Sequence, residues 1–244
     1  MNGPTSRPRL FACAISSAGI RDSKSKSPRD MQCDCIGGKR CMSATAVRSF
    51  TTAGAPGRCK RCLIGQAFCI CADVPTVATR TEVVVVRHER EGWKSTGTAR
   101  IAELAMPNLK MLEYQEDSEP ARSQLGPLVG GAHLLFPSDE VAPWAGVTRL
   151  IVVDGTWRQT RKMYAKLEAL HGVPKLALPA QTTKVLRLRE STFEEGRSTL
   201  EAIAEAISLV EGGEVARPLF ALHDLYVERV FRARGVWDQK KNGA

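Results

Sequence analysis

Hydrophobic positions change their spacing along the chain, and these changes divide it into predicted strands and helices. Short β-branched runs, several apolar on both faces as a parallel sheet requires, predict strands at Glu82–Val86, Ala132–Phe136, Arg149–Val153 and Lys175–Leu178. Apolar residues at helical spacing predict helices at Thr98–Ala105, Gln159–Leu170, Thr199–Val210 and Arg217–Arg232. Strands and helices that alternate over about 170 residues predict one α/β domain with a mainly parallel sheet flanked by helices.

The two ends of the chain lack these periods. Residues 1–55 are rich in Ser, Thr, Gly, Pro and Arg, which predicts a disordered basic extension. The apolar run 10–20 after two arginines, and the acid-poor composition, leave a targeting segment open. The alternative is a dispensable tail, with Met42 as a later start of the protein. Residues 236–244 are predicted to form a short C-terminal tail.

Composition and charge narrow the class of protein. An apolar fraction of 43% excludes disorder throughout and a fibrous fold. No uncharged apolar run approaches the roughly 18 residues of a membrane helix, so we expect no membrane partner and a cytoplasmic location. The formal charge is +9, but the first 61 residues hold 12 of the 35 basic and 3 of the 26 acidic residues, so the remainder is balanced. Global charge therefore does not by itself predict nucleic-acid binding.

Four cysteines lie within 13 residues, as Cys59-x2-Cys62 and Cys69-x-Cys71. A Cys-x2-Cys turn beside a second close pair can supply the four thiolates of a tetrahedral site, which predicts a zinc knuckle over residues 56–75. Disulfides, free thiols and an iron–sulfur cluster remain alternatives, although an α/β body of this size does not need disulfides. Four further cysteines belong to the predicted extension and are interpreted as incidental: Cys13, Cys33, Cys35 and Cys41.

The segment that most clearly indicates a functional site is the turn after the strand Leu150–Val153. The strand ends on Asp154, turns at Gly155 and opens a helix at Thr156 and Trp157. Open α/β sheets bind ligands at the carboxyl ends of their strands, beside helix N-termini. The turn therefore predicts a functional site. The alternative is that Asp154 only caps the helix and Trp157 only fills the core.

This turn and several other segments stand in the order typical of the DTW-domain family, which the sequence resembles from about residue 58 to 232. The matching segments are the cysteines at 59–71, His88-x-x-Glu91 with Lys94-Ser95-Thr96, Asn108, Leu134-Leu135-Phe136-Pro137 with Asp139-Glu140, Asp154-Gly155-Thr156-Trp157, and Ser198-Thr199-Leu200-Glu201-Ala202. The sequence departs from the family pattern at three places. Arg87 stands where the family usually has an apolar residue, and Glu89 stands where it often has proline. No proline lies between Cys62 and Cys69.

The resemblance implies a tRNA-uridine aminocarboxypropyltransferase. Such an enzyme moves the 3-amino-3-carboxypropyl group of S-adenosylmethionine to N3 of a tRNA uridine and leaves methylthioadenosine. The resemblance also implies a SPOUT-like, knotted catalytic domain over residues 76–235, and it leaves open a homodimer of the kind that many SPOUT enzymes form. A SPOUT-like RNA methyltransferase and a non-catalytic zinc-knuckle RNA-binding protein remain alternatives.

The resemblance also suggests roles for individual residues. The predicted catalytic residues are Asp154, as general base or as ligand of the substrate ammonium, Thr156 and Trp157. The predicted S-adenosylmethionine pocket comprises Leu135, Phe136, Pro137, Ser138, Gly155, Leu186, Arg187, Ser198, Thr199 and Glu201, although Ser198 and Thr199 also suit a helix cap. The predicted tRNA contacts are Arg58, Lys60, Arg61, Arg158, Arg161 and Lys162. For the last three, which share one face of a helix, an ordinary solvated face is the alternative. His88 and Glu91 are weaker candidates.

Overall fold

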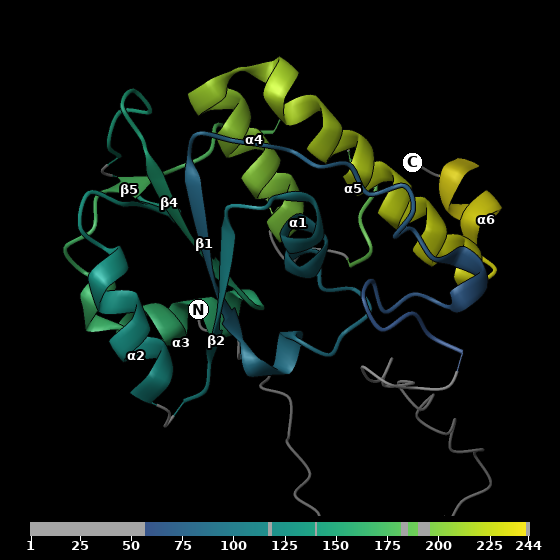
Figure 1. Ribbon diagram of the computed structural model, residues 1–244, viewed down its shortest axis with the longest axis horizontal. Coiled ribbons are helices and arrows are strands. Elements are labelled where there is room, and N and C mark those ends of the chain that lie inside the picture. The colour runs from purple at the N-terminus through teal and green to yellow at the C-terminus, as the bar shows by residue number, and fades with distance from the viewer. Residues whose placement is uncertain (1–56, 117–118, 140, 182–184, 190–195, 243–244) are drawn as a thin grey trace, which may run out of the picture. The chain divides into compact units, whose positions relative to one another are not determined.

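The computed structural model describes residues 57–116, 119–139, 141–181, 185–189 and 196–242. Five strands form one parallel sheet in the order β2-β1-β4-β3-β5 (Figure 1). They are β1 (Glu82–His88), β2 (Leu109–Tyr114), β3 (His133–Leu135), β4 (Arg149–Asp154) and β5 (Lys175–Leu176). The predicted α/β class with a parallel sheet is therefore confirmed. The predicted extension, residues 1–55, lies outside the described residues.

Helices cover both faces of this sheet (Figure 1). They are α1 (Ala99–Ala105), α2 (Glu119–Leu125), α3 (Trp157–Lys166), α4 (Thr199–Glu211), α5 (Gly213–Ala233) and α6 (Trp237–Asn242). Helices α1, α4 and α5 pack on one face, and α2 and α3 pack on the other. In the part of the chain that the structure describes, no helix has both the length and the apolar character needed to cross a membrane.

Strand β1 shows why the central strands are apolar at every position. Val83 and Val85 pack into the core under α1, α4 and α5, whereas Val84 and Val86 pack into the core over α2 and α3. Successive side chains of a strand point to opposite faces, so a strand covered on both faces needs an uninterrupted apolar run. The same alternation in β4 places Ile151 on the α3 side.

Several elements differ from those predicted. Strand β2 was not predicted, because it lies at the sheet edge and carries the exposed residues Lys110 and Glu113. Helix α2 was not predicted either. Helix α3 begins at Trp157 because Thr156 caps it. Gly212, at φ +100°, separates α4 from α5, so α5 begins directly at Gly213 rather than at Arg217. Residues 237–242, assigned from sequence to a tail, form α6.

The cysteine segment packs onto the α/β body. Arg58 and Gly65 pair through an isolated antiparallel bridge, followed by the short 3-10 helix Gln66–Phe68. Cys62, Ile64 and Ile70 are buried in the core that also contains residues of α5. The cysteines are therefore attached to the same core as the sheet.

Candidate active site

Three segments that are distant in sequence meet at the carboxyl ends of β1 and β4. Asp154, the last residue of β4, lies in register with Arg87 of β1. The hydroxyl of Thr199, the first residue of α4, donates a hydrogen bond to Asp154 Oδ1. The backbone N–H of Leu200 donates to Thr98 Oγ1 over 3.3 Å, which joins α4 to the loop that follows β1. The Asp-Gly-Thr-Trp turn is thus enclosed by the loop after β1 and the start of α4.

Asp154 is buried and incompletely hydrogen-bonded. The residue is 6% exposed, and its Oδ2 atom has no hydrogen-bond partner among the described residues. Burial raises the pKa of Asp154 to about 6, although the hydrogen bond from Thr199 acts in the opposite direction. The negative charge of Glu91 raises it further. A carboxylate that titrates near neutrality suits proton transfer or the binding of an ammonium group.

A second buried carboxylate, Glu91, lies in the loop after β1. It is 4% exposed and pairs with Lys94 over 2.5 Å and with Arg189 over 2.9 Å. The Nε atom of Arg189 also donates to Thr96 Oγ1 over 2.8 Å. Arg189 therefore ties the segment before α4 to the loop after β1. Sequence reasoning did not select Arg189, because no spacing or motif distinguished it from the other arginines.

The turn after Asp154 has a reciprocal capping arrangement. The backbone N–H of Thr156 donates to Gln159 Oε1 over 2.7 Å, and the N–H of Gln159 donates to Thr156 Oγ1 over 3.4 Å. A Cβ atom on Gly155 would lie only 3.1 Å from Gln159 Cβ, so the close turn favours glycine. Thr156 thus caps α3 while standing two residues from Asp154.

The start of α4 is braced by a buried ion pair. Ser198 and Glu201 form a second capping box, and Glu201 is 2% exposed. Arg187 binds both carboxylate oxygens of Glu201, over 2.8 and 2.7 Å, and Gln181 donates to the same carboxylate over 2.6 Å. Burial acts to raise the pKa of Glu201, but these donors outweigh it and lower the pKa. The geometry fixes the position of Thr199, which follows Ser198.

An aromatic surface adjoins the turn. Trp157 stacks on Phe136 with ring centroids 5.8 Å apart, and Phe136 stacks on Tyr164 at 4.9 Å. Phe136 directly follows β3, so the end of that strand lies beside the start of α3. Trp157 is 37% exposed. Of the other predicted pocket residues, Leu135, Ser138 and Leu186 are half-buried and Pro137 is exposed.

The predicted tRNA contacts differ in their surroundings. Lys60, Arg61, Arg158, Arg161 and Lys162 are exposed. Lys162 lies 2.6 Å from Glu116, which also pairs with Lys166, so part of the positive charge on α3 is neutralised. Arg58 is half-buried and donates to the carbonyl of Leu63 over 2.8 Å.

The four cysteine sulfurs form a compact cluster. All four lie within 4.8 Å of one another, with Cys59 and Cys71 3.6 Å apart and Cys62 and Cys69 3.7 Å apart. A tetrahedron with zinc–sulfur bonds of about 2.3 Å has edges of about 3.8 Å. Burial acts to raise the pKa of Cys59, but backbone N–H groups of Cys62 and Arg61 outweigh it and bring the pKa to about 6. The donor set and spacing therefore fit a tetrahedral metal ion.

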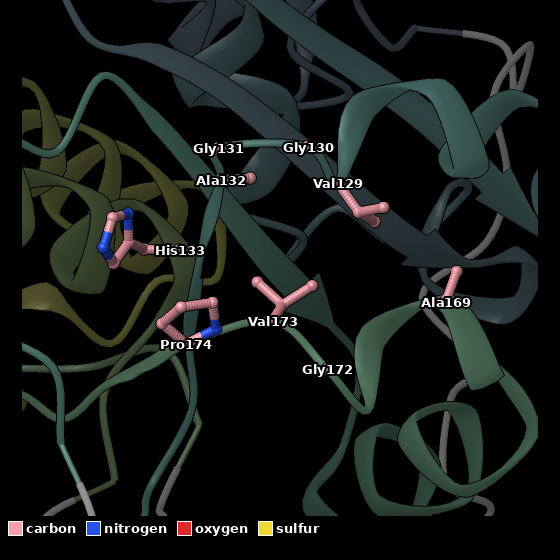
Figure 2. A pocket seen from close by; sticks show the side chains of 9 residues that line it. All are labelled: Val129, Gly130, Gly131, Ala132, His133, Ala169, Gly172, Val173 and Pro174. Carbon is pink, nitrogen blue, oxygen red and sulfur yellow. The ribbon is translucent and has the colours of Figure 1, made fainter.

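A pocket of about 400 Å³ lies away from these residues, at the amino ends of β3 and β5 (Figure 2). Its lining consists of Val129, Gly130, Gly131, Ala132, His133, Ala169, Gly172, Val173 and Pro174. Most of these side chains are small or apolar and offer no acid or base. Because parallel strands share one direction, this pocket and Asp154 are at opposite ends of the sheet.

Fold and site together define an α/β protein with a buried carboxylate at the carboxyl edge of a parallel sheet and an attached four-cysteine cluster. A family model for the DTW domain matches residues 57–231, and the chain belongs to this family. Two curated relatives are both named tRNA-uridine aminocarboxypropyltransferase 2. The Drosophila melanogaster protein is 27% identical over 183 residues, which are 68% of this chain and 73% of the relative. The Macaca fascicularis protein is 24% identical over 184 residues, 67% of this chain and 61% of the relative. No solved structure matches the chain significantly.

Proposed function

We propose that this protein is a tRNA-uridine aminocarboxypropyltransferase, which transfers the 3-amino-3-carboxypropyl group of S-adenosylmethionine to N3 of a tRNA uridine. Membership of the DTW domain family and the names of the two relatives support this activity. The structural observation that carries the proposal is the Asp154 carboxylate, which is buried at the end of β4 and has one oxygen without a hydrogen-bond partner among the described residues.

The reaction sets a defined task for the residues of this site. Uridine N3 must lose its proton and bond to the γ-carbon of the donor, while the carbon–sulfur bond breaks and sulfur keeps the electron pair as methylthioadenosine. Asp154, with a pKa of about 6, is mostly ionised at pH 7 and can accept the N3 proton. The same ionised form can instead hold the ammonium of the transferred group. Thr199 supports either role, because its hydroxyl donates to the carboxylate.

The donor is proposed to bind around the turn that contains Asp154. We propose that Leu135, Phe136, Pro137 and Ser138 contact the donor from the end of β3 and the loop after it, and that Gly155, Leu186, Ser198 and Thr199 contact it from the turn and from the start of α4 and the segment before it. Trp157 forms a stacking surface with Phe136 for an adenine or a flipped base. Arg187 and Glu201 act by bracing α4, since their charged groups bind each other. Thr156 holds the first turn of α3, whose N–H groups suit a carboxylate.

We also propose that residues 76–235 form a knotted, SPOUT-like domain. Supporting this, the chain leaves β5 at one edge of the sheet and returns to the centre, where Arg189 contacts the loop after β1 and Thr199 contacts β4.

Residues 56–75 are proposed to hold a structural zinc ion through Cys59, Cys62, Cys69 and Cys71, which keeps the segment attached to α5. We expect the protein to act in the cytoplasm, and a homodimer remains a proposal.

For tRNA, we propose contacts from Arg58, Lys60 and Arg61 on the cysteine segment and from Arg158, Arg161 and Lys162 on α3. The exposure of most of these side chains supports this assignment.

The small-molecule product tests the reaction class: methylthioadenosine is expected from aminocarboxypropyl transfer. S-adenosylhomocysteine would instead indicate a methyltransferase, and absence of turnover on any tRNA would favour a binding protein.

A further inference from the structure

A pocket of about 260 Å³ lies between the cysteine segment and the C-terminal end of α5, outside the site described above. Its lining consists of Gly57, Arg58, Ile64, Gly65, Ser95, Val230, Ala233 and Arg234. This volume is many times the roughly 10–15 Å³ that a cavity needs to hold one water molecule. An anion the size of a phosphate group, with part of its hydration shell, therefore fits.

The two arginines of the pocket are held by the two elements that form it. Arg58 is fixed by its backbone bridge to Gly65 and by the 2.8 Å hydrogen bond to the carbonyl of Leu63. Arg234 directly follows α5: its backbone N–H donates to the carbonyls of Val230 and Phe231, and its guanidinium carbon lies 5.8 Å from the centroid of the Phe231 ring. Both arginines are half-buried rather than exposed. Pre-positioned arginines lose less conformational freedom when they bind an anion.

Positive charge accumulates around this pocket. Burial lowers the pKa of Arg234, and the charges of Arg189 and Arg58 lower it further, although the buried phenol of Tyr226 acts in the opposite direction. The positive charges of Arg189 and Arg58 therefore act on the Arg234 guanidinium and disfavour its charged form. A bound anion would relieve this repulsion, and arginine is well suited to phosphate because it donates two parallel hydrogen bonds.

The pocket is connected to the proposed catalytic residues through the loop after β1. Ser95 lines the pocket and accepts, through its carbonyl, a 2.5 Å hydrogen bond from the buried hydroxyl of Tyr226. The next residue, Thr96, binds Arg189, and Arg189 pairs with Glu91. Both Glu91 and Arg189 influence the pKa of Asp154. The pocket and the surroundings of Asp154 therefore share the loop that follows β1.

We propose that the pocket formed by Arg58 and Arg234 binds a phosphate of the tRNA backbone close to the uridine that is modified. This inference rests on the proposed function, because it assigns the pocket to the same RNA substrate. Lys60 and Arg61, which are exposed on the same cysteine segment, extend the positive surface beyond a single anion. That extent favours a phosphodiester chain over a free phosphate ion.

The test is tRNA binding measured over a range of salt concentrations. Ala233→Glu places a negative charge at an exposed position of the pocket, and Arg234→Gln removes a positive one. We expect both variants to bind tRNA about 5- to 10-fold more weakly, with the slope of log affinity against log salt reduced by about 0.7–0.9, the value for one phosphate. Arg234→Lys, which keeps the charge, should recover most of the slope.

Matched controls come from the same helix. Ala221→Glu and Arg217→Gln change charge in the same way at exposed positions of α5 that do not line the pocket, and both should bind tRNA as the wild type does. Equal affinity and slope for Ala233→Glu and Ala221→Glu would overturn the proposal. A raised KM for S-adenosylmethionine with unchanged tRNA binding would also overturn it. Because the readout is binding, the result stands apart from whether any uridine is modified.

Discussion

Asp154 is the residue on which the proposed chemistry depends. Its carboxylate is buried, and one hydroxyl donates to it, but Oδ2 has no hydrogen-bond partner in the described ranges. A buried carboxylate without a full set of donors is costly to ionise, which explains why its pKa rises to about 6. A buried carboxylate with a strongly raised pKa is more typical of a reacting group than of a helix cap.

Replacing Asp154 by Asn should abolish transfer without unfolding the protein. The amide keeps an oxygen that can accept from Thr199, so we expect the melting temperature to change by no more than a few degrees. Loss of a general base typically costs about 100- to 10,000-fold in rate, and a fall in that range is expected from initial rates. Asp238→Asn, at an exposed position in α6, serves as the control. A near wild-type rate for Asp154→Asn would contradict the assignment.

The pH dependence of transfer provides an independent check on Asp154. Both proposed roles need the ionised carboxylate, so kcat/KM should rise as pH increases through about 6. Thr199→Val removes a hydrogen bond that favours the ionised form of Asp154, so the pKa of Asp154 should increase. The acid limb, which is the rising part of the plot of kcat/KM against pH, should then move to higher pH. Thr199→Ser retains the hydroxyl and should leave the limb in place. Identical acid limbs for the Val and Ser variants would exclude this coupling.

Individual residues of the site were predictable only where a local pattern marked them. The strand, the glycine turn and the helix start identified the segment of Asp154 directly from sequence. Arg187 and Glu201 were predicted as pocket residues, but the structure pairs their charges with each other. Arg189 was missed, because its contact with Glu91 joins residues 98 positions apart. Pairing over such distances depends on the fold and leaves no local periodicity.

Among the strands and helices, the pattern of burial determines which elements can be predicted from the sequence. The central strands β1 and β4 are covered on both faces, and the resulting apolar runs made them predictable. Strand β2 has one neighbour and mixes buried, half-buried and exposed residues without a two-residue period, and it was missed. Helix α2 is as short as α1, and besides Pro120 its only apolar residues are Ala121 and Leu125, too few for a clear helical period. The capping boxes explain the exact starts of α3 and α4.

The cysteine segment should depend on a metal ion for its attachment to α5. We expect close to one equivalent of zinc in the purified protein, and loss of the metal in Cys62→Ser, because the buried Cys62 thiolate would be one of four ligands. A loss of a few kcal/mol lowers the melting temperature by about 5–10 °C in a chain of this size. Cys41→Ser should change neither quantity. A metal-free protein with an unchanged melting temperature would contradict the zinc assignment.

For the whole molecule, the net charge of +9 is concentrated in the first 61 residues, and the family match begins at residue 57. We therefore expect recognition of tRNA to depend on local groups such as the Arg58–Arg61 segment and the pocket at Arg234. Removing residues 1–55 deletes 9 basic and 3 acidic residues. We expect the shortened protein to keep its transfer rate within about two-fold at saturating tRNA, since the proposed catalytic residues and all the proposed zinc ligands remain. A folded but inactive 56–244 protein would contradict the expectation that residues 1–55 are not needed for transfer.

The most direct measurement is to incubate the full-length protein with S-adenosylmethionine and tRNA, digest the tRNA to nucleosides and analyse both products by mass spectrometry. We expect 3-(3-amino-3-carboxypropyl)uridine and methylthioadenosine in equal amounts, and neither product with Asp154→Asn. A methylated nucleoside with S-adenosylhomocysteine, or no modified nucleoside with any tRNA, would contradict the proposed activity.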